Sequence, residues 1–347
     1  MGETEPFSSI GHLGPEIRGG ERLYLNAESS FQDPESFVKA WGDLLSEAQA
    51  HPEAVSRVVL HGIISDAVLE EIQREPHDGM LEAVIPLGKE LGRPDNNLIY
   101  LGLNDPNRQP LTPIEEIVRE TSAPTEVRTP PEQRIFESIQ AGNGVKTTIT
   151  PADYDDLYEL WGTTFGWNHG QIDAFAQRLE ADRHTEKLDR SVWFAGVEHD
   201  GLLVSAVMAE RLTLPGNDGP IDLVESTEWA TRKGHDGNGY TPTALAALNA
   251  QILGDLADSP NGRPLIFAEC NFTNRADRTG SSVGMVIPSR EYASQVLPQN
   301  VVVGDGQQPH GYRDFNLMVL PLKSQQAYYS PGQIDHILGM INSEVTT

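Results

Sequence analysis

Three glycines, Gly234, Gly237 and Gly239, form a turn whose backbone could bind a phosphate group. The turn follows an expected strand at 223–230 and precedes an expected helix at 242–258. Successive main-chain N–H groups at such a turn, with the positive end of a helix behind them, cradle a pyrophosphate. Glycine is suited to this role because it lets a ligand approach the backbone closely. Ordinary loops carry the same pattern, so both interpretations stay open at this point.

The glycine turn does not fit the dinucleotide-binding pattern. That pattern needs G-x-G-x-x-G directly after the first strand of a βαβ unit, with an acidic residue after the second strand. Here the turn comes late and follows an antiparallel hairpin, which alternating apolar residues predict at 191–198 and 202–212 around a turn at 199–201. A dinucleotide-binding site is therefore excluded.

The charge of the chain excludes one class of partner. Aspartate and glutamate number 51 against 25 lysine and arginine, which gives a net charge of −26. Nucleic acid is not an expected partner, because each phosphate contact needs a cation. The composition favours a protein adapted to concentrated salt, where screening shortens the range of self-repulsion. An acidic cytoplasmic enzyme without that adaptation is the alternative.

The expected location is cytoplasmic. The chain contains no run of 18 apolar residues, so no membrane span is predicted. The first residues are polar and acidic and do not resemble a signal peptide. Cys270 is the single cysteine, which excludes an internal disulfide and fits a reducing compartment; we expect it to be a packed small residue. No HExxH or CxxC spacing occurs, so no metal site is predicted.

Composition divides the chain into four parts. Residues 1–20 are expected to form a flexible N-terminal tail, 21–103 a small N-terminal α/β lobe, 104–143 a Pro-rich linker and 144–347 a second domain. The linker contains prolines at 106, 110, 113, 124, 130 and 131, together with two short helical pieces.

The two globular parts differ in their order of elements. For the lobe, apolar spacing predicts strands at 21–27, 56–62, 80–87 and 97–103, and helices that begin near 34 and 66. For the second domain it predicts, besides the hairpin, the glycine turn and its helix, strands at 145–150, 265–270 and 315–320 and helices that follow 150 and span 171–188.

The order of elements in the second domain resembles that of the Gcn5-related N-acetyltransferase (GNAT) fold over residues 145–323. The resemblance implies an α/β fold: a mixed, mostly antiparallel twisted sheet flanked by helices, with the smaller N-terminal α/β lobe attached. It also implies an enzyme that uses acetyl-CoA as acyl-donor substrate and acetylates a small-molecule amine.

The family's phosphate loop, Gln/Arg-x-x-Gly-x-Gly/Ala, aligns here with Asp236, Gly239 and Thr241, so only the central glycine is retained. Asp236 is unfavourable beside phosphates, although cations lie just upstream at Arg232, Lys233 and His235. The resemblance assigns acetyl-CoA binding to Trp229, Ala230, Thr231, Asp236, Gly237, Asn238, Gly239, Tyr240, Thr241 and Asn274.

One branch of the superfamily offers a closer match. Residues 225–231 resemble the Glu-x-x-Asp-Phe-Ala-Thr segment of β-lysine N-acetyltransferases, which also begin with a small α/β lobe. Residues 297–304 and 312–320 resemble that branch's last conserved segments, with extra sequence at 286–312. This match implies β-lysine or a similar diamino acid as the acceptor.

The resemblance places catalysis on Glu225 and Glu228. Glu225 lies eleven residues before Asp236, the spacing of the general-base glutamate in several family members. Glu228 would face the opposite side of a regular strand, but a bulge would bring both carboxylates to the cleft and let Glu228 bind an ammonium or relay a proton. The alternative is that one or both face solvent.

The usual general acid of the family is missing, because Gly280 stands where a tyrosine protonates the leaving thiolate. Tyr240, Tyr312 and His310 are candidates by position only. Trp167 either packs on the acceptor or belongs to the core.

Two functions from different classes remain at this stage. The first is an N-acetyltransferase that works by direct attack in a ternary complex. The second is a non-catalytic acyl-CoA-binding sensor or interaction protein with the same fold, favoured by the altered phosphate loop. A homodimer is compatible with either.

Overall fold

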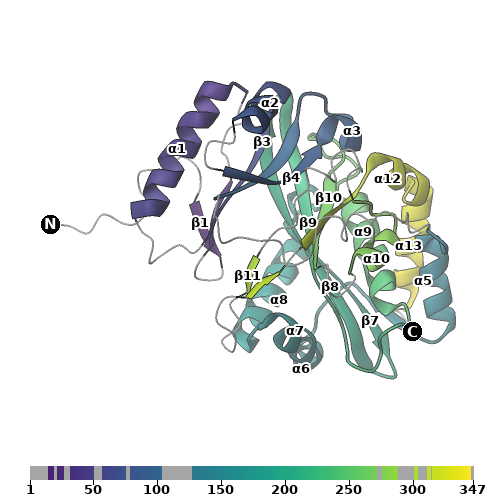
Figure 1. Cartoon of the computed structure of the whole chain (residues 1–347). Coiled ribbons are helices and arrows are strands. Elements are labelled where there is room, and N and C mark those ends of the chain that lie inside the picture. The colour runs from purple at the N-terminus through teal and green to yellow at the C-terminus, as the bar shows by residue number, and fades with distance from the viewer. Residues whose placement is uncertain are drawn as a thin grey trace.

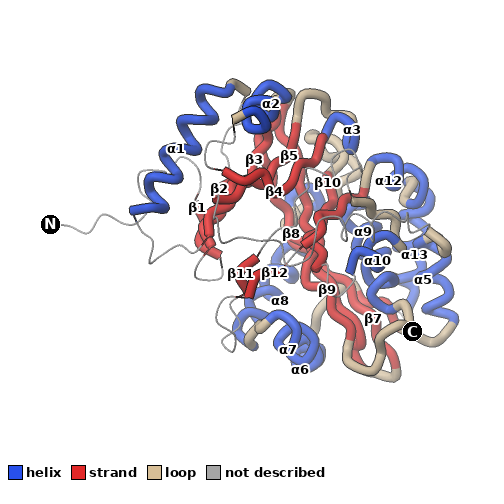
Figure 2. Tube along the Cα trace, in the orientation of Figure 1, coloured by secondary structure: helices blue, strands red, loops and turns tan. Residues whose placement is uncertain are grey.

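Two β-sheets organise the chain (Figure 2). The computed structural model describes residues 15–18, 22–26, 32–50, 57–75, 79–103, 127–271, 276–287, 301–303, 311–313 and 315–344. Within these residues lie a five-stranded sheet near the N-terminus, a six-stranded sheet in the second half and a two-stranded ribbon of β11 (Val301–Val303) and β12 (Gly311–Arg313).

The first sheet confirms the predicted strands and helices of the lobe. Its order is β1-β2-β3-β5-β4, with β2 and β3 parallel and the other pairs antiparallel. The helices are α1, α2 and the short α3, and the side chain of Ser65 caps α2 by accepting from the Val68 N–H. The bounds are β1 Pro15–Arg18, β2 Arg22–Asn26, α1 Pro34–Ala50, β3 Arg57–Ile64, α2 Asp66–Arg74, β4 Gly79–Pro86, α3 Leu87–Leu91 and β5 Asn97–Leu103.

Two segments differ from their expected roles as tail and linker. Residues 15–18 form β1, which pairs antiparallel with β2; Gly19 and Gly20, a residue type that hairpin turns favour, follow β1 in the sequence. Within the expected linker, the helix α5 (Pro131–Gln140) packs against α9 and α13 of the second domain. Ile135 of α5 is fully buried in the same cluster as α9, so the core extends into that part of the chain.

The second sheet is mixed and mostly antiparallel, which confirms the predicted fold class. Its order is β13-β10-β9-β8-β7-β6, and only β9 and β10 run parallel. The bounds are β6 Gly144–Lys146, β7 Val192–His199, β8 Leu202–Gly216, β9 Gly219–Thr231, β10 Leu265–Asn271 and β13 Phe315–Leu320.

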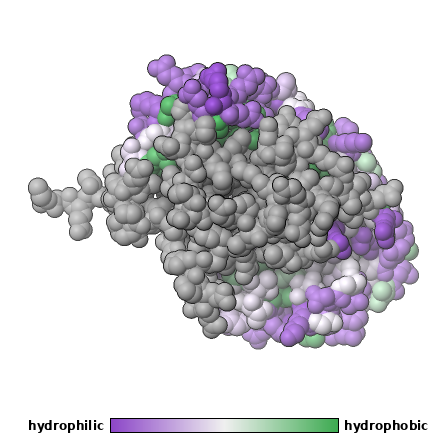
Figure 3. All heavy atoms as spheres, in the orientation of Figure 1, coloured by the Kyte–Doolittle hydropathy of each residue, from purple (hydrophilic) through white to green (hydrophobic). Residues whose placement is uncertain are grey.

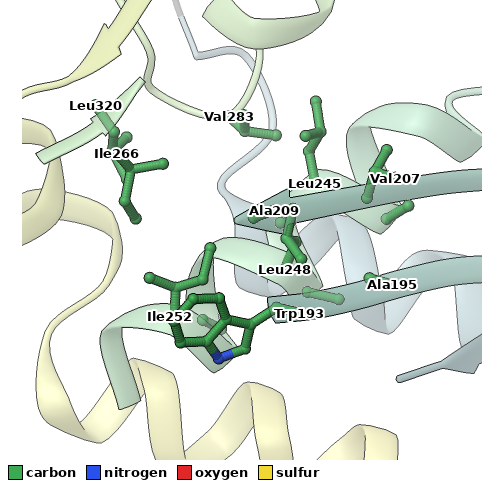
Figure 4. Close-up of a cluster of buried hydrophobic side chains, with 14 of the residues drawn as sticks. Trp193, Ala195, Val207, Ala209, Leu245, Leu248, Ile252, Ile266, Val283 and Leu320 are labelled. Carbon is green, nitrogen blue, oxygen red and sulfur yellow. The ribbon is translucent and has the colours of Figure 1, made fainter. Parts of the chain in front are cut away.

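One face of this sheet is covered by helices around α9 (Tyr240–Asp255), which Figure 1 shows beside α10 (Ala276–Ser281), α5 and α13 (Pro331–Glu344). The short helix α12 (Leu322–Tyr328) precedes α13. The helix α9 is buried on most of its surface, and Leu245, Leu248 and Ile252 are fully buried. Figure 4 shows them packed with Trp193 and other side chains of the strands.

The opposite face is shared by two groups of elements. The helices α6 (Tyr154–Leu157) and α8 (His169–Arg183), joined by a π-helical turn (Tyr158–Gly162) and α7 (Thr163–Phe165), cover β7 and β8. The N-terminal lobe covers the other part, because its Ile63, Leu98 and Tyr100 share a cluster with Leu223 and Phe267.

A hydrogen-bond clamp joins the lobe to the hairpin between β8 and β9. Arg93, after α3, donates to both carboxylate oxygens of Asp218 at 2.7–3.0 Å and to the Gly219 carbonyl at 3.0 Å. The Asn96 side chain accepts from the Asn217 N–H at 2.8 Å. The lobe and the second sheet therefore share both a core and a polar contact.

Candidate active site

Strand β9 bulges where the two predicted glutamates lie. Ala206 of β8 pairs with Ala230 and Met208 pairs with Thr227, so β9 has an additional residue opposite Val207. Glu228 takes up this irregularity with a φ of 54°, in the left-handed region that residues other than glycine rarely adopt. The expected bulge is therefore present, and its backbone strain is at a glutamate.

Two tryptophans hold the bulge. Trp161, in the π-helical turn, donates its indole N–H to the Glu228 carbonyl at 2.9 Å, and Trp167 donates to Glu228 Oε1 at 3.3 Å. The two rings lie 5.1 Å apart, and Trp161 is fully buried. π-Helical turns are rare and often occur at functional sites. Glu228 consequently lies against the two tryptophans of the segment between α6 and α8.

Burial changes the acidity of Glu228. Loss of solvent, together with the nearby charge of Glu210, raises the pKa of this carboxyl to about 7, and the Trp167 hydrogen bond acts in the opposite direction. A carboxyl with a pKa near neutrality is suited to proton transfer at physiological pH.

Glu225 lies on the same face as Glu228. In the ladder it stands directly opposite Glu210 of β8, and residues opposite one another share a face of the sheet. Glu210 forms an ion pair with Arg178 of α8 at 2.7 Å. The bulge thus brings the two predicted glutamates to one face, together with Glu210, which the sequence did not indicate.

Strands β9 and β10 separate beside these carboxylates. Their parallel pairing extends from Leu223–Leu265 to Glu225–Phe267 in the ladder. Beyond that point the described part of β9 pairs only with β8, and the described part of β10 pairs only with β13. Among the described residues, main-chain groups along the β9 edge next to the bulge therefore have no ladder partner in β10.

The glycine turn leads from β9 into α9 with an open backbone. Gly234, Gly237 and Gly239 have φ values of 89°, 80° and 79°, so the turn needs glycine. No side chain caps α9, and its first turn contains no acidic residue. In the described part of the chain, the main-chain N–H groups of residues 236–241 have no hydrogen-bond acceptor. Such a row of free donors at a helix N-terminus is an anion site.

Most side chains of the predicted acetyl-CoA segment have structural partners. The Trp229 indole donates to Ser226 Oγ at 2.9 Å, Ala230 is buried and Thr231 hydrogen-bonds to Thr241. Only backbone groups of these residues remain for a ligand. In the turn, Asp236 and Gly237 are exposed, Asn238 donates to the His235 carbonyl at 3.1 Å and Tyr240 is buried.

The cations expected to compensate for Asp236 are not equivalent. Arg232 is held by Asp156 at 2.6 Å and by Glu159, so its charge is already neutralised. Lys233 is exposed, and His235 lies 6.2 Å from the Tyr240 ring. Arg232 is therefore not available to compensate for the charge of Asp236, which is the role that the sequence suggested for it.

The missing tyrosine has a packing explanation. A Cβ added to Gly280 of α10 would lie 2.8 Å from Met318 Sδ and 3.3 Å from the Trp229 ring. A larger residue at this position would require the Met318 side chain to move, because Trp229 and Met318 already fill the space. Asn274 and His310 lie outside the described residues, and the side chain of Tyr312 does too.

Two further predictions concern other chemistry. Cys270 is buried, and burial raises the pKa of its thiol well above the ordinary value, which disfavours the reactive thiolate. Among the described residues, no group of three or more potential ligands is arranged to hold a metal ion. No described helix is long and apolar enough to cross a membrane.

The sequence missed the role of Trp161 as a support for the bulge. Trp161 has the spacing of a core residue on its helix, and its single hydrogen bond to the Glu228 carbonyl leaves no pattern in the sequence. The sequence did not indicate Glu210 either. Its position opposite Glu225 depends on the register in which β8 pairs with β9, which local sequence patterns do not specify.

No family model matches the chain, and a search of curated proteins finds no match. Similar solved structures include a putative acetyltransferase from Salmonella typhimurium with its cofactor acetyl-CoA (18% identity, 52% of this chain, 94% of that chain, TM-score 0.35). Another is the paia N-acetyltransferase of Thermoplasma acidophilum in complex with coenzyme A (10% identity, 52% and 98% covered, TM-score 0.27). A third is a probable N-acyltransferase from Enterococcus faecalis (17% identity, TM-score 0.29); the match covers 41% of this chain and 32% of that one.

Proposed function

We propose that the chain is an acetyl-CoA-dependent N-acetyltransferase that transfers an acetyl group to a small-molecule amine. The observation that carries this proposal is that one strand, β9, bears a partly buried carboxyl with a pKa of about 7 and runs into a turn of free N–H donors. A proton acceptor and a phosphate cradle are the two groups that acetyl transfer from coenzyme A to an amine needs.

In the proposed reaction Glu228 acts as the general base. Its carboxylate removes a proton from the ammonium of the acceptor, and the neutral amine attacks the thioester carbonyl. The C–N bond forms, the tetrahedral intermediate collapses and the C–S bond breaks. The remaining extra proton on the nitrogen passes to the departing thiolate, which leaves as coenzyme A, and Glu228 returns its proton to solvent. Glu225, on the same face, adds a negative charge that attracts the cationic acceptor, whereas the charge of Glu210 is paired with Arg178.

The diverging strands would hold the donor. Main-chain N–H and C=O groups along the free edge of β9 are suitable partners for the amide groups of the pantetheine arm. The turn at residues 236–241 then lies where the phosphates follow. Residues 229–231 contribute backbone groups in this proposal, since their side chains have other partners.

The acceptor proposed from the sequence is β-lysine or a similar diamino acid, and the acidic face of β8 and β9 is compatible with a second ammonium group. Isothermal calorimetry with acetyl-CoA, followed by a thiol-release assay with a panel of monoamines, diamines and β-lysine, tests the proposal. Acetyl-CoA binding and turnover on an amine would support it. Absence of acetyl-CoA binding would contradict it.

The second candidate, a non-catalytic acyl-CoA-binding protein, is favoured by Asp236 in the turn and by Gly280 in place of the usual acid. Binding of acetyl-CoA without turnover on any amine of the panel would support this second function.

A further inference from the structure

Arg134, on α5, has no hydrogen-bond or ion-pair partner for its guanidinium group among the described residues, although the charge of Glu137 on the same helix acts on it. Its Nε atom is buried and has no hydrogen bond, and in the described part of the chain no carboxylate pairs with it. Burial lowers the pKa of this guanidinium from its ordinary value, but an arginine remains charged at neutral pH. In a chain with 51 acidic residues, an unpaired and partly buried arginine is unusual.

The guanidinium of Arg134 lies over the glycine turn. A Cβ added to Gly239 would be 3.6 Å from Arg134 Nη1. Gly239 precedes the first residue of α9, in the segment 236–241 whose N–H groups have no acceptor. Two independent features, a free cation on α5 and free donors on the turn, thus converge on one place.

An anion would satisfy both features. Burying an unpaired charge costs folding free energy, and a bound phosphate returns the missing hydrogen bonds to the guanidinium. The turn itself offers no partly buried, unpaired cation, because Arg232 is held by Asp156 and Glu159, Lys233 is exposed to solvent and Asp236 has the wrong sign.

We propose that Arg134 binds the diphosphate of acetyl-CoA and replaces the cationic or amide side chain that the turn lacks. This inference rests on the proposed function and deepens it: the segment expected to be a linker supplies a residue of the donor site. Arginine suits the role because its planar fork donates two parallel hydrogen bonds to a phosphate.

Calorimetry on Arg134→Gln, Arg134→Lys and the wild type tests the proposal with three probes: coenzyme A, pantetheine and inorganic diphosphate. Arg134→Gln should weaken coenzyme A binding about 10- to 100-fold, in the range of a lost charge-assisted phosphate contact. Affinity for pantetheine should not change, and diphosphate should no longer compete with coenzyme A. Arg134→Lys keeps the charge but not the fork and should give an intermediate loss.

The enzyme assay gives a second readout. Arg134→Gln should raise KM for acetyl-CoA and leave kcat at saturating donor unchanged, since the residue does not touch the reacting atoms. Arg183→Gln, which removes a surface arginine of α8, is the control for the change in net charge. Circular dichroism checks that each variant is folded. If Arg134→Gln does not fold, the affinity of Arg134→Lys for coenzyme A decides the test.

Three outcomes overturn the inference. Unchanged coenzyme A affinity in Arg134→Gln would remove Arg134 from the site and leave the proposed function intact. Equal weakening for coenzyme A and pantetheine would indicate a general structural role. Absence of coenzyme A binding by the wild type would overturn both proposals together.

Discussion

Glu228 combines two unfavourable features at one residue, a left-handed backbone and a partly buried carboxyl group. Each costs folding free energy, on the order of 1–3 kcal/mol for a strained backbone. The surrounding structure maintains both through the indole donors of Trp161 and Trp167. Strain held in place by specific partners is characteristic of functional positions, which supports Glu228 over Glu225 as the base.

The first prediction concerns the rate. Glu228→Gln should lower kcat/KM about 10²- to 10⁴-fold, because glutamine cannot accept the ammonium proton. In the wild type kcat/KM should rise with pH through about 7, where Glu228 ionises, and the variant should lose this limb. Steady-state kinetics from pH 5 to 9 measures both effects, with Glu225→Gln as the comparison. A variant with the wild-type profile would exclude Glu228 as the base.

The second prediction concerns stability. The pKa of Glu228 rises from 4.5 to about 7 on folding, so between these values the unfolded chain loses its proton first. The free energy of unfolding therefore falls as pH rises through this window. Glutamine does not ionise, so the stability of Glu228→Gln does not fall in this window. The variant should be more stable than wild type by about 1–2 kcal/mol at pH 8.

Urea unfolding at pH 4.5 and pH 8 checks the stability prediction. The advantage of Glu228→Gln over wild type should be present at pH 8 and shrink at pH 4.5. Glu186→Gln, an exposed change in the turn after α8, is the control. An advantage of the same size at both pH values would show that burial of the charge is not its cause.

The sequence was sufficient to propose Glu225 and Glu228 as site residues but not to predict the protonation of Glu228. Glu225 and Glu228 were identified from a resemblance, and the bulge that unites them was expected. The pKa of Glu228 was not predictable, because it depends first on burial in the folded chain and then on Trp167 and Glu210, which come from other elements. Arg134 was missed for the same reason: its position beside Gly239 exists only after α5 packs on α9.

At the scale of elements, the glycine turn and α9 form the part of the site that depends on backbone shape. Gly239 has a φ of 79°, and replacement by any residue with a Cβ strains it. The turn retains the main-chain features of a phosphate cradle although its side chains depart from the family pattern. Backbone conformation is thus the property to test.

The third prediction is that Gly239→Ala raises KM for acetyl-CoA about tenfold or more and lowers stability by about 1 kcal/mol. The added Cβ strains the turn and approaches Arg134 Nη1 at 3.6 Å. Gly201→Ala, in the hairpin between β7 and β8, is the matched control: its φ is 75° and a Cβ there meets no atom within 4 Å. It should lose similar stability without a change in KM. Equal KM in both variants would contradict the assignment of the turn.

Element boundaries show where local sequence is sufficient. The strand at 97–103 and the hairpin after 191 were predicted closely, because alternation and turn residues lie within them. The residues of helix α5 were assigned to the linker because the prolines of that segment, Pro130 and Pro131 among them, indicated irregular structure. Proline is favoured at the first turn of a helix, and α5 indeed starts with Pro131.

At the scale of the whole molecule, the lobe and the second sheet have one continuous apolar contact. Ile63 and Tyr100 from the lobe pack with Phe267 and Leu317 of the sheet, on the face that also carries Glu225. The lobe thus covers the sheet at the end of β9 where β9 and β10 pair. Its deletion would expose this cluster to water.

The fourth prediction concerns the surface charge. The described surface in Figure 3 is largely hydrophilic at its margins, and the chain has a net charge of −26. Screening of this repulsion by molar KCl should raise Tm, by about 2–4 °C for each kcal/mol gained. Thermal scans in 0.1 M and 2 M KCl at pH 7 test this expectation.

A control follows from the isoelectric point. At pH 4.6 the net charge is near zero, so the effect of KCl through screening should largely disappear. No stabilisation by KCl at pH 7 would contradict adaptation to concentrated salt and leave an ordinary acidic enzyme.

The bulge in β9 has a consequence for engineering of this chain. A regular strand turns its side chains to alternate faces, so the orientation of Glu228 depends on the extra residue opposite Val207. Deletion of one residue from the bulge would restore the alternation of side chains along β9. A neighbour of Glu228 would then turn toward Trp161 and Trp167. Libraries of point substitutions cannot make that move. Libraries of one-residue insertions and deletions in this strand would explore new placements of the base within an unchanged scaffold.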